Sequence, residues 1–527
     1  MFVDARSVAA GTVVESDLCI VGAGAAGITL AREFLDAGLR VSVVESGALD
    51  FAADTQELYS GQSVGLPIID LTASRLRYFG GTTNHWGGWC LPLEPIDFEV
   101  RDDLPYRGWP IDRTELDPWY AKAQEVLLLG PFDYRPASWG IQPGLIPAPF
   151  NGPHFECGLW QVSREPRLSI VYGPMLKQAP AVTVFLNANA EHLVADDAGR
   201  TVQQLGVATL SGNRFTIRSK LFVLAAGGIE TARLLLASGK PGRPGIGNEH
   251  DLVGRFFMVH FEYDSGTIVV ANPHTDFSFY TNEHLKSPGR LYEPFKLNFV
   301  TFVAVNPASL RKLGLPNVRI RWTYDYHPAI DAINALQRLL RGPRSHLLHD
   351  VGTILRDLDS AEEFAFRKAM NWPALPVRSL NVRMSGEPLP NPDSRITLSD
   401  ERDALGMRRV VADWRLTGED KRKALALQHL LGTELGRTGF GRLRSAMSSD
   451  DNTWPDDFYG DEHHMGTTRM HTDPAQGVVD PNCRVHGMAN LYVASSAVFP
   501  TAGVANPTLT IVALALRLAA HIKRQTL

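Results

Sequence analysis

Two segments near the C-terminal end of the chain carry side chains that could handle the proton and the oxygen of an alcohol. A His-His-Met-Gly turn begins at His463, and an Asn-Pro pair follows at Asn506. Because an imidazole titrates near neutral pH, His463 or the adjacent His464 could take the proton of a hydroxyl group. The carboxamide of Asn506 could donate to the oxygen as it becomes a carbonyl. His463 and Asn506 are therefore the candidate catalytic residues, with His464 as the alternative base and a candidate substrate contact.

The Asn-Pro pair also predicts the start of the last helix. Proline is common at the first position of a helix, so a helix is expected from about Pro507 to Lys523, capped by Asn506. Free amides at a helix start stabilise a nearby anion by about 0.3–2 kcal/mol. A reduced flavin carries negative charge, so this helix start could face a flavin ring. Two structural histidines and a plain helix cap are the alternative interpretation of these residues.

A nucleotide-binding signature lies at the opposite end of the chain. The pattern predicts a strand, a helix and a second strand over residues 17–21, 28–37 and 40–44, with Gly38 ending the helix. Between the first strand and the helix, Gly22, Gly24 and Gly27 would let the backbone approach a pyrophosphate at the helix N-terminus. Glu45, at the end of the second strand, would accept hydrogen bonds from a ribose. A tight turn with an incidental acid is the alternative.

A loop rich in glycine and tryptophan follows over residues 77–91. FAD and NAD share the first signature, but this loop suits a large planar ring better than a nicotinamide, which favours FAD. Gly81, Thr83, Asn84 and His85 are the candidate contacts. His85 could be joined to the isoalloxazine covalently or could form a hydrogen bond with it. As a single residue, it could equally be a loop histidine packed beside its tryptophan neighbour.

The remaining pattern predicts a discontinuous nucleotide-binding domain with an insertion. Strands alternate with helices near both ends, whereas the middle suggests an antiparallel sheet. The expected fold class is α/β, α+β overall: a Rossmann-like FAD-binding domain of residues 1–265 and 440–527, with a flavin-covering loop near 75–110. Residues 266–439 form the expected substrate domain, built on an antiparallel sheet and helices. Its expected elements are strands over 256–326, helices over 330–370, strands over 380–416 and a helix over 420–435 that Gly436 ends.

The sequence gives fewer indications of the residues that contact the substrate. Glu387 lies in the strand-forming stretch expected over the flavin face, and it could hydrogen-bond a polyol or an amino sugar. A solvated strand end is the alternative. The apolar positions and arginines within residues 330–358 could form a lid, a contact for an electron-transfer partner or a membrane surface; a core-facing helical pair with a solvated basic face is the simpler interpretation.

Composition narrows the class of protein. The net charge of −5 argues against a nucleic-acid partner, which would favour a basic face. The four cysteines form no Cys-x-x-Cys pair, so neither a metal site nor a disulfide framework is expected. No signal peptide and no long uninterrupted apolar stretch are visible, so a cytoplasmic protein without a membrane span is expected. Monomer and homo-oligomer are both open.

The chain resembles the glucose–methanol–choline (GMC) oxidoreductases over nearly its whole length, closest to the branch of pyranose oxidase and the bacterial sugar or glycoside dehydrogenases. Besides the glycine signature and the Gly80–Trp86 loop, three runs carry the resemblance: A-A-G-G-I-E-T-A-R-L-L-L at 225–236, P-N-P-D-S-R-I-T-L at 390–398 and N-P-T-L-T at 506–510. The resemblance implies that His463 is the base, that Asn506 is its polar partner, and that His85 occupies the position of covalent flavin attachment. Asn84 stands where pyranose oxidase has Thr. The residues that the family pattern also places against FAD are Ala226, Ser495, Pro507 and Thr508.

The expected reaction is the oxidation of a hydroxyl group of a sugar, glycoside or related polyol to a carbonyl, with the hydride passing to flavin N5. Oxygen or another acceptor would then reoxidise the flavin. Two further reactions fit the same residues: oxidation of a non-sugar alcohol in secondary metabolism, and a lyase reaction in which FAD is held structurally. A non-catalytic flavin-binding module would predict a degenerate site, which the presence of His463 and Asn506 does not favour.

Overall fold

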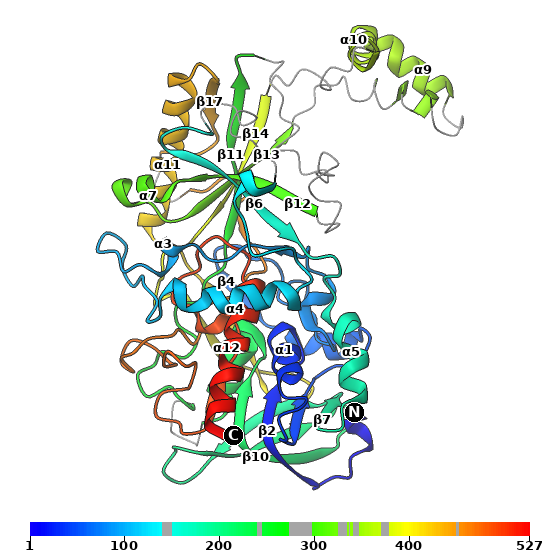
Figure 1. The fold of residues 1–527 in the computed structure, drawn as a ribbon, viewed down its shortest axis with the longest axis vertical. Helices are drawn as coiled ribbons and strands as arrows, with labels where there is room; N and C mark the ends of the chain where they lie inside the picture. The colour runs from blue at the N-terminus through cyan, green and yellow to red at the C-terminus, as the bar shows by residue number, and fades with distance from the viewer. Residues whose placement is uncertain are drawn as a thin grey trace.

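The computed structural model describes residues 1–139, 150–239, 245–272, 298–324, 332, 335–336, 338–340, 347–369, 379–449 and 453–526. Two parts are stacked along the long axis of the molecule (Figure 1). The lower part holds a largely parallel sheet and both ends of the chain, and the upper part holds an antiparallel sheet. This arrangement confirms the expected mixed α/β class.

The parallel sheet has the strand order β1-β7-β3-β2-β10-β9-β8, and β19 pairs with β10 beyond this path. Its strands are β1 (Phe2–Asp4), β2 (Val13–Val21), β3 (Val41–Val44), β7 (Val182–Leu186), β8 (Asn189–Ala195), β9 (Val202–Ala208), β10 (Arg214–Leu224) and β19 (Leu491–Val493). Strand β2 is central, and Leu18, Cys19 and Ile20 are fully buried. A continuous apolar run is what a parallel strand covered on both faces requires.

A tight turn joins β2 to helix α1 (Ala25–Glu33). Gly22 has a φ of +101°, which favours glycine. A Cβ atom at Gly27 would lie 1.9 Å from the carbonyl oxygen of Gly22, so only glycine lets the helix pack this close to the strand. The helix begins three residues before the predicted start and ends at Glu33, and Gly38 then turns the chain toward β3 with a φ of +68°.

The antiparallel sheet has the order β17-β11-β14-β13-β12-β6-β5, with β18 paired to β11. Its strands are β5 (Trp89–Cys90), β6 (Phe155–Val162), β11 (Phe261–Val270), β12 (Asn298–Val305), β13 (Val318–Tyr324), β14 (Ser379–Gly386), β17 (Gly441–Ser445) and β18 (Tyr459–Gly460). The sheet thus draws strands from both sides of the predicted insertion at 266–439. A small third sheet joins β15 (Arg395–Arg402), β16 (Arg408–Trp414) and β4 (Gln62–Gly65).

Helices connect and cover these sheets. Besides α1, the described helices are α2 (Ala53–Gln56), α3 (Pro95–Phe98), α4 (Arg113–Val126), α5 (Leu168–Gln178), α6 (Gly227–Ala237), α7 (Pro307–Leu313), α9 (Leu347–Arg356), α10 (Leu358–Ala369), α11 (Gly418–Arg437) and α12 (Thr508–Thr526). A capping box between Thr417 and Asp420 starts α11. The sequence predicts its end at Gly436, but the helix runs to Arg437 and the left-handed glycine is Gly439.

The stretch predicted as helical over 330–370 contains α9 and α10, and most of its remainder lies outside the described residues. Figure 1 places these two helices away from both sheets. Within the described part of the chain, none of the helices has the length and apolar character needed to cross a lipid bilayer.

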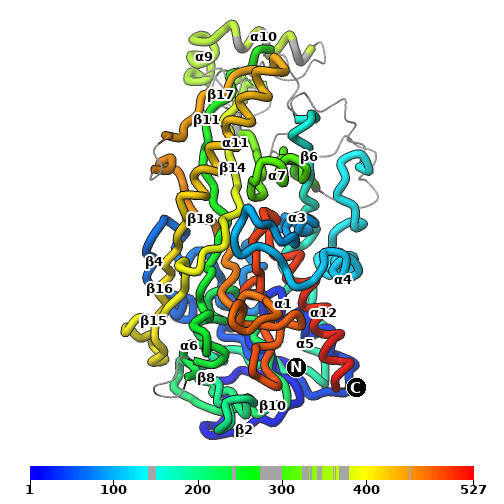
Figure 2. Tube along the Cα trace, turned by 90° about the vertical axis from the view of Figure 1, so that its left-hand side faces the viewer, coloured from blue at the N-terminus to red at the C-terminus, as the bar shows by residue number. Residues whose placement is uncertain are grey.

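The end of the chain returns to its beginning. The two termini lie at the same end of the molecule in both views (Figures 1 and 2). Helix α12 packs against α1 and α4, and β19 pairs with β10 in the same sheet as β2. This return carries the candidate catalytic segments to the glycine turn.

Candidate active site

A cavity of about 580 Å³ lies where the two ends of the chain meet. Its wall contains the β2–α1 turn, the loop around residues 73–87, the start of α6, the 461–464 turn and residues 506–508 at the start of α12. Strands β2, β3, β10 and β19 are parallel neighbours, so their carboxyl ends open at the same edge of the sheet. Ligands of open α/β sheets bind at such an edge.

The sequence-predicted nucleotide residues gather at this edge. Gly22, Gly24 and Glu45 line the cavity, whereas Gly27 lies behind the turn, where it allows the close packing of helix and strand. The carboxylate of Glu45 accepts hydrogen bonds from the amides of Ala23 at 2.8 Å and Gly47 at 3.0 Å. Burial raises the pKa of Glu45. This side chain is therefore fixed in one orientation beside the glycine turn.

The loop at 81–87 covers another wall. Gly81 has a φ of +54°, and a Cβ atom there would lie 3.0 Å from the Cα of Gly24, so loop and turn are in close contact. Gly81, Thr83 and His85 line the cavity. Burial lowers the pKa of His85, which favours a neutral ring.

Asn84 faces away from the cavity. Its amide nitrogen donates to the carbonyl of Phe79 at 3.0 Å, and its amide oxygen accepts from the hydroxyl of Ser169 at 2.6 Å. Asn84 is absent from the cavity wall, so the predicted contact between its side chain and the cofactor is not found. Its hydrogen bonds instead tie the loop to α5.

The predicted residues near the starts of the last helices also reach the cavity. Ala226, Ser495, Pro507 and Thr508 all line it. Helix α12 begins at Thr508, and the amide of Ile511 donates to the carbonyl of Pro507 at 2.9 Å. The amides of the first turn have no partner within the helix and are directed toward its N-terminal side, where the cavity lies.

Two buried polar atoms of the cavity wall test whether a large polar cofactor fits. The hydroxyl of Ser74 and Nε2 of His464 are buried and have no hydrogen-bond partner among the described residues. Buried polar atoms are rarely left unpaired in native proteins. A bound dinucleotide, rich in hydroxyl, phosphate and ring acceptors and donors, would supply the missing partners. The two unpaired polar atoms, the glycine turn and the fixed carboxylate of Glu45 therefore suit FAD.

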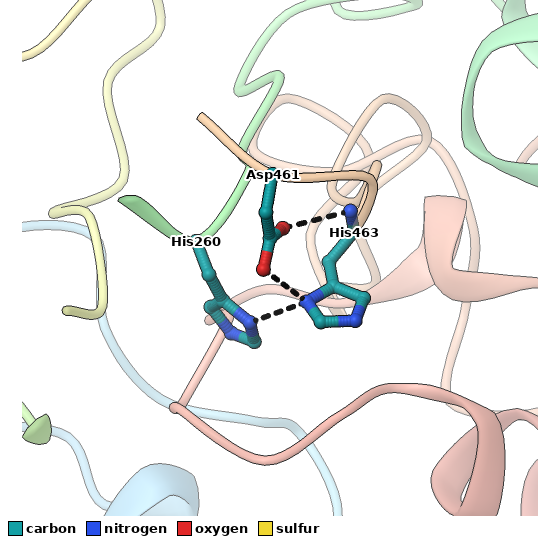
Figure 3. A group of neighbouring side chains, drawn as sticks. All are labelled: His260, Asp461 and His463. Atoms are coloured by element: carbon teal, nitrogen blue, oxygen red, sulfur yellow. Dashed lines mark hydrogen bonds and ion pairs between the residues drawn. The ribbon is translucent and has the colours of Figure 1, made fainter. Parts of the chain in front are cut away.

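His463 lies at the centre of a hydrogen-bonded group (Figure 3). Its Nδ1 is 2.8 Å from an oxygen of Asp461, and its Nε2 is 3.3 Å from the amide nitrogen of Asn506. Its backbone amide also donates to Asp461 at 2.9 Å. Burial opposes the charged ring, but the Asp461 carboxylate outweighs burial and raises the pKa of His463.

These contacts fix which ring nitrogen carries the proton. A carboxylate accepts, so Nδ1 of His463 donates to Asp461 and Nε2 keeps its lone pair. The amide nitrogen of Asn506 then donates to Nε2. A hydroxyl group that replaced the Asn506 amide beside Nε2 could therefore give its proton to His463. Asp461 would then stabilise the positive charge on the ring.

A backbone pairing holds the carboxylate and a further histidine beside the base. The amide of Asp461 donates to the carbonyl of His260 at 2.9 Å, and Met258 and Met465 exchange hydrogen bonds in an isolated bridge. The ring of His260 is buried, with Nδ1 3.0 Å from Nδ1 of His463. Burial and the neighbouring His463 lower the pKa of His260 to about 4.

His464 lies in a different environment from His463. Its ring is buried and stacks on Phe257, and it lines the cavity. Burial and then Arg75 lower the pKa of His464 to about 3, so the ring is neutral near pH 7. Because no carboxylate of the described residues contacts this ring, the geometry favours His463 as the base.

Known proteins resemble this chain in sequence and in fold. Residues 390–515 match the family described as GMC oxidoreductase. The chain is 27% identical to 6'''-hydroxyparomomycin C oxidase of Streptomyces lividus, over 95% of this chain and 90% of that protein. It is 24% identical to the fructose dehydrogenase large subunit of Gluconobacter japonicus, over 96% of this chain and 97% of the relative. A fungal aryl-alcohol oxidase shares the fold, with a TM-score of 0.57 and 17% identity over 97% of this chain and 99% of that one.

The chain is an FAD-dependent oxidoreductase that resembles the GMC family, whose model matches its C-terminal part. FAD is the cofactor of such an enzyme, and the glycine turn, Glu45 and the start of α12 would hold it. When bound, FAD supplies the ring that accepts a hydride from an alcohol.

Glu387 does not line the cavity of this oxidoreductase. Its carboxylate is buried, accepts from Arg107 at 2.8 Å and from the amide of Asn317 at 3.0 Å, and is absent from the cavity wall. Its other oxygen accepts from the amide of Gly503 at 3.0 Å. Because Gly503 lies three residues before Asn506, Glu387 anchors the segment that carries the predicted polar partner. The expectation of a substrate contact is corrected accordingly.

Several cavity residues were not found by the sequence analysis. Asp461 lies two positions before His463, which could have suggested an orienting carboxylate, but His260 gives no such local signal. In the cavity wall, Glu262 and Arg321 form an ion pair at 2.6 Å, and the hydroxyl of Tyr459 is 3.4 Å from Glu262. These residues come from β11, β13 and β18, so their common position follows from strand pairing alone.

We expect Glu387→Ala to destabilise the protein by about 3–5 kcal/mol, because it leaves the buried guanidinium of Arg107 without its strongest partner. Turnover should also fall, since the amide of Gly503 loses its acceptor near Asn506. Urea unfolding of the FAD-loaded enzyme measures the first effect, and kcat measures the second. Glu249→Ala, at an exposed carboxylate, is the matched control and should change stability by less than about 0.5 kcal/mol. Equal stability of the two variants would contradict the anchoring role.

Proposed function

We propose that this chain oxidises a hydroxyl group of a sugar, glycoside or related polyol to a carbonyl. The observation that carries the proposal is the arrangement of Asp461, His463 and Asn506 in series, with Nε2 of His463 at 3.3 Å from the amide of Asn506 at the cavity wall. The names of the two relatives, an oxidase of a hydroxyparomomycin and a fructose dehydrogenase subunit, support a carbohydrate as the substrate class.

Each of the three residues has a separate task. Nε2 of His463 accepts the hydroxyl proton, so the oxygen becomes negative as the adjacent carbon loses hydride. Asp461 holds Nδ1–H and stabilises the imidazolium that forms. Asn506 donates a hydrogen bond to the reacting oxygen, which positions the substrate carbon against the cofactor side of the cavity. The start of α12 stabilises negative charge that develops nearby.

The part of the cavity wall that contains Glu262 and Arg321 suits a substrate with several hydroxyl groups. Glu262 accepts from Arg321 at 2.6 Å and from the hydroxyl of Ser385 at 2.7 Å. Nε of Arg321 is buried and has no hydrogen-bond partner among the described residues. A hydroxyl oxygen of a sugar would supply that partner, while the exposed carboxylate of Glu462 at the same cavity could accept from another hydroxyl or from an ammonium group.

An anaerobic substrate screen tests the reaction. Sugars, glycosides, amino sugars and simple diols are each mixed with FAD-loaded enzyme, and loss of the flavin absorbance is followed. We expect carbohydrates to bleach the flavin and the His463→Ala variant to do so about 10²–10⁴-fold more slowly, because the general base is lost. His429→Ala, at an exposed position of α11, should bleach at the unchanged rate. Product formation without bleaching would favour the lyase reaction, and bleaching only by simple diols would assign a non-sugar substrate.

The pH dependence of turnover tests the pairing of Asp461 with His463. The carboxylate raises the pKa of His463, and the base works only when unprotonated, so kcat/KM of the enzyme should rise with pH through that pKa. Removing the charge in Asp461→Asn should lower the pKa of His463. The acidic limb should then move to lower pH while the plateau rate falls, because the tautomer is no longer fixed. Asp102→Asn, at an exposed carboxylate, should leave the limb in place; an unmoved limb in Asp461→Asn would refute the pairing.

We further propose that His85 is the point of covalent flavin attachment. Its ring lines the cavity, and burial favours the neutral form, which has a lone pair available. Acid precipitation of the enzyme should leave the yellow colour in the protein pellet, and His85→Ala should release it into the supernatant. His192→Ala, at an exposed strand position, should keep the colour in the pellet. Colour in the supernatant of the unmodified enzyme would show a non-covalent cofactor.

A further inference from the structure

Three side chains, the base His463 among them, bring possible metal-ligand atoms close together (Figure 3). Nδ1 of His260, a carboxylate oxygen of Asp461 and Nδ1 of His463 all lie within 4.8 Å of one another. The two ring nitrogens are 3.0 Å apart, and Nδ1 of His463 is 2.8 Å from the carboxylate. No other group of three such ligands was found among the described residues.

The rings of His260 and His463 carry too few protons for every one of these contacts to be a hydrogen bond. A neutral imidazole carries one N–H, and Nε2 of His260 faces the carbonyl of Ala502 at 3.4 Å, so its proton belongs on that side. Nδ1 of His260 therefore presents a lone pair. The carboxylate of Asp461 is also an acceptor. The single proton on Nδ1 of His463 is thus left between two acceptors, and it can form only one good hydrogen bond.

The spacing is close to that of a tetrahedral metal centre. Zinc–nitrogen bonds of about 2.0–2.1 Å place neighbouring ligands about 3.3 Å apart. The observed separations of 3.0 and 2.8 Å would need to open by a few tenths of an ångström. Two imidazoles and one carboxylate are ligands that zinc, cobalt and copper accept.

The surroundings hold the ligands in place. The Ala502 carbonyl orients the ring of His260, and the backbone amide of His463 donates to the second oxygen of Asp461 at 2.9 Å. Such outer contacts set ring orientation and tautomer at metal sites. Asp461 and His463 line the cavity, which gives an ion a route of entry and leaves a fourth position for water.

We propose that His260, Asp461 and His463 form a binding site for a divalent zinc-type cation that inhibits the enzyme. The ion replaces the proton on Nδ1 of His463, and that proton is carried on Nε2 of the neutral ring. Nε2 then has no lone pair for the substrate hydroxyl, so proton abstraction stops. The inhibitory effect rests on the proposed role of His463 as the base, whereas binding of the ion does not.

Cobalt binding to the FAD-loaded enzyme tests the site directly. Co²⁺ bound by nitrogen and oxygen ligands gives ligand-field absorption at longer wavelengths than the flavin. We expect a saturable signal corresponding to one ion per chain, which Zn²⁺ displaces. Zn²⁺ should inhibit turnover over the same concentration range, and a chelator should restore it.

Variants separate the site from adventitious binding. Loss of an outer partner of a metal ligand lowers metal affinity by about 10–100-fold. Because His260→Asn removes a direct ligand, we expect a larger fall in the affinity for Co²⁺. Asp461→Asn provides a second test of the same ligand set, and retained flavin absorbance shows that each variant is folded. His429→Asn, at an exposed residue of α11, should bind Co²⁺ with unchanged affinity.

Each outcome bears on one proposal. Absence of the cobalt signal, or an unchanged signal in both ligand variants, would overturn the metal site. Cobalt binding in an enzyme that bleaches with no alcohol would support the metal site while refuting the proposed function. Zinc binding without inhibition would refute the inhibitory role, because an occupied Nδ1 cannot coexist with a basic Nε2.

Discussion

The active site depends on one set of strand pairings, in which β10 lies between β2 and β19. Phe222 of β10 pairs with Cys19 on one side and with Leu491 on the other, so residues from the beginning, middle and end of the chain run parallel. The carboxyl ends of these strands must open at the same edge. Everything that follows them is brought together there: the glycine turn after β2, the start of α6 after β10 and Ser495 after β19. The cavity is a consequence of this register rather than of any single loop.

A second constraint is a buried charge cluster that links the antiparallel sheet to the final segment. Glu387 follows a strand of the antiparallel sheet, yet its carboxylate binds the amide of Gly503 in the final segment. Arg107 pairs with Glu387 at 2.8 Å and lies 3.6 Å from Asp97, so the three charges are buried together. Burial and then Glu387 raise the pKa of Asp97 to about 7. Because truncating one partner of such a cluster leaves an uncompensated charge, the cluster holds the segment before Asn506 in a defined position.

The sequence was informative where the chemistry is local. The glycine turn, the acid at position 45 and the Asn-Pro helix start are set by backbone conformation and helix geometry, and each can be recognised within a few residues. Gly22, Glu45 and Pro507 line one cavity, and their contact with FAD stays a prediction. By contrast, Asn84 belongs to the same short loop but turns toward α5, because a side chain can point to either face of a loop without changing the pattern.

Pairing between strands that are distant in the chain creates neighbours that could not be predicted from the sequence. Strand β18 pairs with β11, with Phe261 opposite Gly460, and this places His260 beside Asp461 although 200 residues separate them in the chain. Neither residue has a periodic or motif signal that connects it to the other. The predicted substrate contact of Glu387 was wrong for a related reason: its buried partners, which are Arg107 and the amides of Asn317 and Gly503, come from distant segments.

The adjacent pair His463 and His464 shows how neighbours, rather than residue type, assign roles in this cavity. His464 is buried, His463 is partly buried, and both line the same space, so burial alone would lower the pKa of each. Asp461 reverses that effect for His463, whereas Arg75 adds to it for His464. In the proposed mechanism, His463 therefore gains the proton while the ring of His464 stays neutral. When two environments push the pKa values of two groups apart, one group can titrate while the other keeps its charge. Here the two groups, His463 and His464, are consecutive residues of one turn.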